Sequence, residues 1–160
     1  MPDGRLLAIY LNDHLGGATG GVELAKRALR SNRGSDLGTF LEGLVAELEE
    51  DRQALRSVLA QLGIRESRAK PVFGLVAERL GRLKLNGQLR GYSPLSRVLE
   101  LEGLTMGIEG KASLWRNLRE TPVAERLREI DLDALLARAA RQQASLEPHR
   151  VEAARRAFSR

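Results

Sequence analysis

Four long segments of this sequence carry apolar residues at alternating spacings of three and four, which is the repeat of one helix face. The segments cover residues 5–30, 36–62, 94–120 and the stretch that begins near residue 131. Aromatic residues make up only 4% of the chain, while leucine and alanine are abundant, and this mixture favours helix over sheet. The sequence therefore predicts an all-α protein built from four long helices.

The ends of these segments carry residues that typically start or stop helices. Gly34 and Gly63 are placed to end the first and second helices in a left-handed conformation. Pro94 follows Ser93 at the start of the third, which suits the first turn of a helix, and Asp131 is placed to cap the last. The first two helices are joined by so few residues that we expect them to be antiparallel neighbours.

The connection between the second and third helices is much longer, at about 30 residues. It contains a predicted short amphipathic helix over about 69–85, followed by the turn-forming stretch NGQLRGYSP. Such a connection is too long for a hairpin and long enough to travel the length of a bundle. We therefore expect a long crossover between the second and third long helices.

One long crossover at this place resembles the ferritin-like superfamily. More loosely, the chain is similar to the bacterial stress-associated bundles of that superfamily, whose biochemical role is undefined. The resemblance implies a ferritin-like four-helix bundle with a short extra helix in the crossover between the second and third long helices. The length of 160 residues suits one domain that covers residues 1–160.

The resemblance also raises the question of a di-metal site. Such sites take a Glu from each of two helices and Glu-x-x-His from each of the other two, because carboxylate and imidazole groups bind and bridge iron or manganese. Here the second helix offers Glu47 and Glu50 at the right spacing without a histidine, and Glu147-Pro148-His149 in the last helix is one residue too short. The sequence thus predicts no complete metal site and no cofactor, with iron or manganese as the alternative. The candidate ligands for that alternative are His14, Glu47, Glu50, Asp51, Glu102, Glu109 and His149.

Several polar residues fall on the otherwise apolar helix faces, and buried carboxylates among them need partners. In the second helix, Asp51 stands in the apolar series between Leu48 and Leu55. In the third helix, Glu102 and Glu109 share a second apolar stripe that would face the core. The full set is His14, Asp51, Glu102, Glu109, Gln142 and His149. It predicts a polar network in the core that fixes helix register; the alternatives are a ligand or single-metal pocket inside the bundle, or an incorrect helical phase.

The first segment contains four glycines within its predicted helix: Gly16, Gly17, Gly20 and Gly21. Each costs up to about 1 kcal/mol relative to Ala in a helix interior. A dinucleotide-binding or phosphate-binding loop is excluded by spacing, because Val22 and Glu23 follow the last glycine. We expect the glycines to allow close approach of another backbone, to mark a local break, or to form a close contact in a homodimer.

The net charge of +5 is concentrated in residues 64–97, which hold eight Lys or Arg against two Glu. The second helix, over 36–63, is acidic, with six Asp or Glu against two Arg. Neutralisation of this helix by the basic segment is the favoured interpretation; binding of nucleic acid or another polyanion is the alternative. The candidate anion-binding residues are Arg65, Arg68, Lys70, Arg79, Arg82, Lys84, Arg90 and Arg97.

Several classes of function are disfavoured. The absence of cysteine excludes disulfides, thiolate metal sites and a cysteine nucleophile. No serine lies in a nucleophile-elbow motif, no segment approaches the roughly 18 apolar residues of a membrane span, and the start lacks the pattern of a signal peptide. The sequence favours a cytoplasmic, non-catalytic scaffold or stress-associated binding protein. A degenerate di-iron or di-manganese protein of the oxidase or ferroxidase kind is the enzymatic alternative.

Overall fold

The computed structural model describes residues 4–67 and 91–159, which form four long α-helices and one short 3-10 helix. The elements are α1 (Gly4–Ser31), α2 (Asp36–Gln61), α4 (Pro94–Arg119), η1 (Pro122–Arg126) and α5 (Leu132–Phe158). All four long helices predicted from the sequence are confirmed, and the described ranges contain no strand. The short helix predicted over 69–85 lies outside the described residues.

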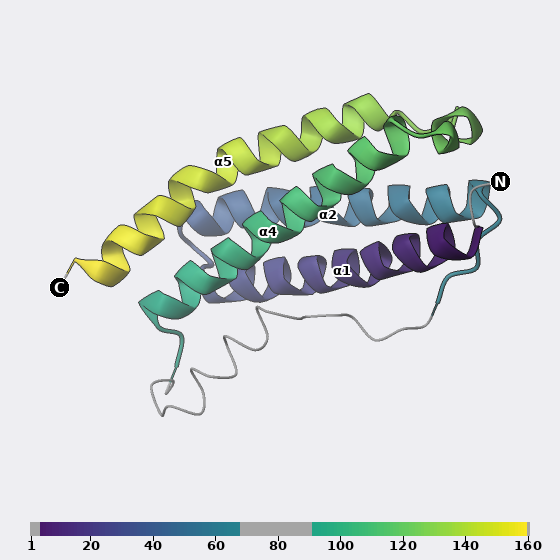
Figure 1. Cartoon of the computed structure of the whole chain (residues 1–160). Helices are drawn as coiled ribbons and strands as arrows, with labels where there is room; N and C mark the ends of the chain where they lie inside the picture. Colours follow the sequence, from purple (N-terminus) through teal and green to yellow (C-terminus); the bar gives the residue numbers. More distant parts are fainter. Residues whose placement is uncertain (1–3, 68–90, 160) are drawn as a thin grey trace.

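The helices form an elongated bundle in which the most extensive contacts join α4 to α5 and α1 to α2 (Figure 1). The members of each pair run antiparallel, as expected for α1 and α2. Helices α2 and α4 run in the same direction, so the end of α2 and the start of α4 lie at opposite ends of the bundle. Helix α4 also packs on α1, whereas α2 and α5 touch only slightly.

The predicted start and stop residues act as expected. The predicted cap Asp131 accepts a hydrogen bond from the backbone amide three residues later, at 2.8 Å. Ser35 and Ser93 cap α2 and α4 in the same way, each at 3.1 Å. Gly34 and Gly63 adopt φ values of 77° and 68°, which favour glycine over residues with a side chain. The helix ends are therefore set by local sequence.

One glycine in the first turn of α2 is required by packing. A Cβ added to Gly38 would lie 2.2 Å from the backbone oxygen of Asn32, whereas one added to Gly43 in the same helix would meet nothing within 4 Å. We expect Gly38→Ala to lower the free energy of unfolding by about 1–3 kcal/mol through overpacking. Gly43→Ala should instead raise it by up to about 1 kcal/mol through helix propensity. Urea unfolding of both variants tests this pair, and equal stabilisation by the two would contradict it.

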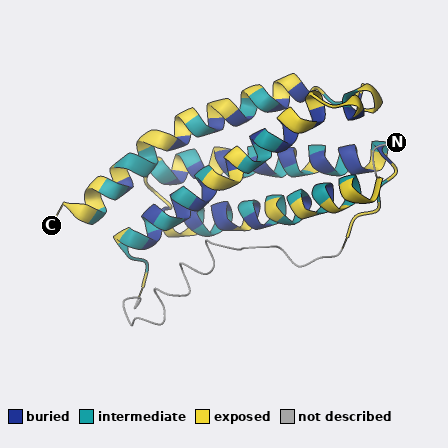
Figure 2. Cartoon of the chain, viewed as in Figure 1, coloured by how far each residue is buried: buried dark blue, intermediate teal, exposed yellow. Residues whose placement is uncertain are grey.

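The hydrophobic core has two parts along the bundle, and Figure 2 shows its buried residues on the inward faces of the helices. One part, near the α1–α2 turn, gathers residues such as Val22, Leu41 and Leu101. The other surrounds Trp115, which is completely buried near the far end of α4. These two parts leave the middle of the bundle for polar residues.

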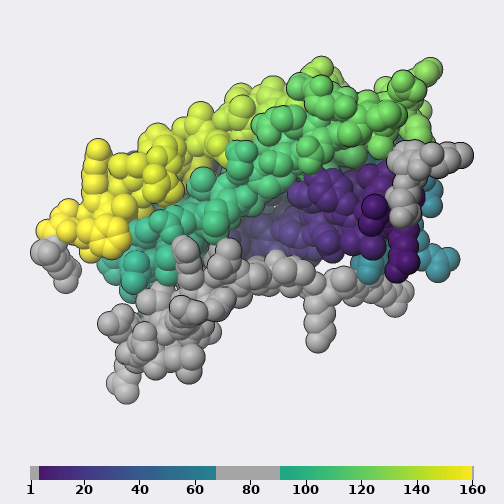
Figure 3. All heavy atoms as spheres, viewed as in Figure 1, coloured from purple at the N-terminus to yellow at the C-terminus, as the bar shows by residue number. Residues whose placement is uncertain are grey.

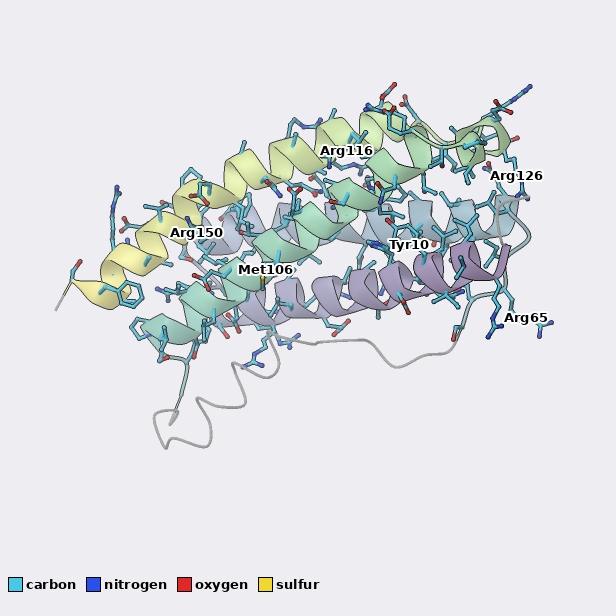
Figure 4. The ribbon with its side chains drawn as sticks, viewed as in Figure 1. Tyr10, Arg65, Met106, Arg116, Arg126 and Arg150 are labelled. Atoms are coloured by element: carbon cyan, nitrogen blue, oxygen red, sulfur yellow. The ribbon has the colours of Figure 1, made fainter. Side chains whose placement is uncertain are left out.

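The prediction that a second apolar stripe of α4 faces the core is wrong. Met106 is 44% exposed and lies on the outward face of the helix (Figure 4), and Glu109 is exposed as well. Glu102 is half-buried, and the completely buried carboxylate of this helix is Glu100. Helix α4 packs on α1 and α5, and the face between these two contacts is open. The sequence therefore predicted one more buried face on α4 than the structure contains.

Candidate ligand-binding cavity

Two of the polar residues predicted on apolar faces meet in the middle of the bundle. Asp51 from α2 and Gln142 from α5 are both buried, and each accepts a hydrogen bond from Lys111 of α4. The Lys111 Nζ lies 2.6 Å from Gln142 Oε1. The Gln142 amide nitrogen donates to Glu47 at 2.9 Å and to Asp51 at 3.1 Å. The expected polar core network is confirmed for these residues, and it joins three helices.

Both oxygens of Asp51 face a cation. Lys111 binds Oδ2, and Arg138 Nε lies 3.3 Å from Oδ1, at ion-pair distance but without the geometry of a hydrogen bond. Arg138 also pairs with Glu50 at the protein surface. Burial lowers the pKa of the Lys111 amine, although the Asp51 carboxylate opposes this shift. The three carboxylates of this cluster are Asp51, Glu50 and Glu47, and its two cations are Lys111 and Arg138. The cluster therefore carries one net negative charge.

Lys111 was missing from the candidates drawn from the sequence. It occupies the gap between Ile108 and Trp115 in the apolar series of α4, just as Asp51 occupies the gap between Leu48 and Leu55 in α2. A pair of opposite charges at such gaps on two helices was the signal that could have identified it.

A cavity of about 440 Å³ lies beside this cluster, between α1, α2 and α4. Its opening lies in the hollow between α1 and α4 in Figure 3. The volume falls within the range of small-molecule sites, and the walls are mostly apolar, as such sites require. The apolar walls are formed by Leu48, Leu55, Leu104, Ile108, Leu114 and Trp115.

Four helix-interior glycines border the cavity: Gly17 and Gly21 on α1, and Gly107 and Gly110 on α4. A Cβ at any of them would meet nothing within 4 Å. The prediction of a close backbone approach is therefore wrong for Gly17 and Gly21, since both face open space. The prediction of a helix break is also wrong for them, since α1 is continuous there. The missing side chains keep the space between the two helices open.

The remaining polar groups of the cavity come mainly from α1. Tyr10 and His14 pack edge to face with ring centroids 4.6 Å apart, and Figure 4 labels Tyr10 at the side of α1 that faces α4. Burial lowers the pKa of His14, although Asp13 opposes the shift. The histidine is therefore neutral near pH 7. The Trp115 Nε1 is buried and has no hydrogen-bond partner among the described residues.

The other candidate metal ligands are not brought to one place. Glu109 accepts a hydrogen bond from Gln143, and His149 stacks on Phe40 with ring centroids 4.6 Å apart. Glu102 is half-buried on α4 and lies close enough to Arg150 to interact with its charge. Within residues 4–67 and 91–159, no three His, Asp or Glu side chains lie close enough together to hold a metal ion. The carboxylates that do gather, around Asp51, are bound by amine, amide and guanidinium groups instead.

A second buried network, missed from the sequence, ties the end of α1 to the start of α4. Glu100 accepts a hydrogen bond from the Tyr92 hydroxyl at 2.8 Å and has Arg27 Nε 3.1 Å from its other oxygen. Asn32 donates to the same hydroxyl at 2.9 Å and accepts from Arg97 Nε at 2.8 Å. Burial raises the pKa of Tyr92 to about 12, so its hydroxyl remains a donor at neutral pH.

The burial of Glu100 predicts a pH dependence of stability. Burial raises the pKa of this carboxyl against the opposing effects of Tyr92 and Arg27. A raised pKa in the folded state means that its stabilising contribution is full below the unfolded pKa of about 4.3 and is lost as pH rises through the folded value. We expect the stability of Glu100→Gln relative to the wild type to increase from about pH 4 to about pH 7. Urea unfolding at several pH values measures this difference, and a decrease toward neutral pH would contradict it.

Of the eight candidate anion-binding residues, Arg65 and Arg97 lie in the described part of the chain. Arg65 follows α2 and is labelled in Figure 4, whereas Arg97 lies in the first turn of α4 at the other end of the bundle. Arg97 is also engaged by Asn32 and lies 5.5 Å from the Tyr92 ring centroid. These two residues therefore do not form one patch. The other candidates, Arg68, Lys70, Arg79, Arg82, Lys84 and Arg90, lie outside the described residues.

Comparisons of the chain with protein-family models, with curated proteins and with solved structures gave no match. None of the helices in the described ranges combines the length and apolarity that crossing a bilayer requires.

Proposed function

We propose that this chain is a non-catalytic binding protein that holds a small, largely apolar molecule in the cavity between α1, α2 and α4. The observation that carries the proposal is the set of four helix-interior glycines that border this one cavity and face open space. Apolar walls and a few polar groups at one end complete the usual composition of a ligand site.

The glycines support a function for the cavity, because each of them lowers the stability of the helix in which it lies. Each lowers helix stability by up to about 1 kcal/mol relative to Ala, and none is required by a neighbouring atom. Residues that disfavour their own secondary structure, and that packing does not require, are expected at functional sites. Larger side chains at these positions would fill the cavity, so the glycines are explained if the cavity is used.

The ferritin-like arrangement remains part of the proposal. It is supported by the parallel directions of α2 and α4 and by the long connection that joins them. The oxidase-like alternative is less well supported, because Glu47, Glu50 and Asp51 are engaged by Lys111, Gln142 and Arg138. A stress-associated binding role is compatible with a cavity that takes up an apolar compound.

Binding of N-phenyl-1-naphthylamine tests the proposal, because this neutral dye becomes fluorescent in apolar sites. We expect the wild type to bind one dye molecule per chain and Gly21→Leu to weaken binding roughly tenfold or more, by placing a side chain in the cavity. Gly43→Leu is the matched control, since Gly43 also lies inside a helix and faces open space away from this cavity.

Two results would contradict the proposal. One is an absence of saturable dye binding to the folded wild type. The other is equal loss of binding in the Gly21 and Gly43 variants, which would place the dye elsewhere or trace the loss to altered folding. Circular dichroism of each variant confirms that its helices are intact before the comparison is made.

A further inference from the structure

We infer that the ligand of this cavity is a neutral molecule with a hydrogen-bond-accepting oxygen, such as a ketone, and that Lys111 donates a hydrogen bond to that oxygen. The inference rests on the proposed function and adds the chemical class of the ligand. It follows from the donors that remain unused in the cavity and from the charges around them.

Lys111 has one donor to spare. A lysine ammonium carries three N–H groups, and those of Lys111 bind Asp51 and Gln142 but have no third partner among the described residues. The side chain of Lys111 is 12% exposed and belongs to the cavity wall. An oxygen placed there by a ligand would accept a hydrogen bond from the N–H group that has no partner in the described part of the chain.

Each acceptor oxygen of Asp51 and Gln142 already faces a cationic or amide group of the protein, although Asp51 Oδ1 lies only at ion-pair distance from Arg138. Asp51 binds Lys111 and the Gln142 amide through Oδ2 and faces Arg138 through Oδ1. The Gln142 oxygen accepts from Lys111. This end of the cavity therefore offers a ligand a donor rather than an acceptor, which selects for an accepting group on the ligand.

The surrounding charge selects a neutral group over an ionised one. The cluster of Asp51, Glu47, Glu50, Lys111 and Arg138 carries one net negative charge. Asp13 adds a carboxylate to the lining of the cavity, and the lowered pKa of His14 leaves that ring neutral. A carboxylate ligand would have to share the Lys111 ammonium with the buried Asp51 carboxylate that already binds it, whereas a ligand ammonium would meet the Lys111 ammonium directly.

Three probes of nearly equal shape test the inference by displacement of N-phenyl-1-naphthylamine: 2-acetylnaphthalene, its hydrocarbon analogue 2-isopropenylnaphthalene, and 2-naphthoate. We expect the ketone to bind roughly tenfold or more tightly than the hydrocarbon, since a hydrogen bond to a charged donor is worth that much. The carboxylate should bind more weakly than the ketone.

Variants assign the preference to Lys111. The double variant Asp51→Leu/Lys111→Met removes both charges of the pair, so it leaves neither one buried alone. It should still bind the dye and the hydrocarbon but lose the preference for the ketone. Lys26→Met removes an amine outside the cavity, from a half-exposed pair with Glu49, and should keep that preference. Should the double variant not fold, the ¹³C shift of a carbonyl-labelled ketone replaces it: binding to an ammonium moves the resonance downfield of its position in hexane.

The outcomes separate the inference from the proposed function. Equal binding of ketone and hydrocarbon by the wild type would overturn the inference and leave the cavity as an apolar binding site. Tighter binding of the carboxylate, a ketone preference that persists without Lys111, or a carbonyl resonance unshifted from hexane would overturn it as well. Failure of the dye to bind the wild type would instead remove the proposed function on which the inference rests.

Discussion

Lys111→Met is expected to lower the free energy of unfolding by about 3–5 kcal/mol, because it leaves Asp51 buried beside an apolar side chain. Arg138 remains near one oxygen of Asp51 but does not hydrogen-bond to it, and Gln142 loses the donor to its own oxygen. The loss therefore affects two buried acceptors at once. Urea unfolding followed by circular dichroism measures it.

Two controls make this result specific. Lys26→Met removes an amine from a half-exposed pair with Glu49, 2.7 Å apart, and should cost no more than about 1 kcal/mol. The double variant Asp51→Leu/Lys111→Met should recover most of the lost stability, because a buried ion pair can be replaced by apolar residues at little cost. If the Lys26 and Lys111 variants are equally stable, or if the double variant is the least stable, the described role of the cluster is incorrect.

Trp115→Ala is expected to cost about 3–5 kcal/mol as well, through loss of apolar contacts and creation of a void. Trp115 is completely buried, it packs in the core around the end of α4, and it forms part of the cavity wall. Its removal therefore affects both the core and the ligand site. Thermal or urea unfolding by circular dichroism measures the cost, since the substitution removes the chain's single tryptophan fluorophore.

Trp115→Phe distinguishes packing from hydrogen bonding at the same position. The indole Nε1 has no hydrogen-bond partner among the described residues, so its removal breaks no described polar contact. We expect this variant to lose clearly less stability than Trp115→Ala, because most of the aromatic contacts remain. Equal losses in the two variants would show that the indole N–H makes an interaction essential to the fold.

The helix boundaries could be predicted because their causes are local. Ser35 and Asp131 cap their helices with their own side chains, and Gly34 and Gly63 end helices through their own backbone freedom. The buried faces of α2 and α5 followed the apolar periodicity for the same reason, which placed Asp51 and Gln142 in the core. These features depend on residues within a few positions of each other.

The face of α4 could not be predicted in this way. Its apolar residues are compatible with two buried faces, and only the positions of α1 and α5 decide that Glu100 is buried while Met106 and Glu109 are exposed. The identity of the partner of Asp51 was hidden for the same reason, because Lys111 lies 60 residues away in the sequence. The glycines of α1 were equally ambiguous, since a glycine permits a close contact and a gap alike.

The sequence by itself determined the number of long helices and the ends that are set by caps and glycines, because periodicity, capping and backbone freedom act over a turn or two of chain. The tertiary structure alone decided what the polar residues and the glycines do. The role of the Asp51 carboxylate depends on the group that faces it, which is Lys111. Whether a glycine such as Gly21 leaves a gap or allows a close contact depends on whether another helix fills the space beside it. Both depend on how α1, α2, α4 and α5 pack, and packing joins residues that lie far apart in the sequence.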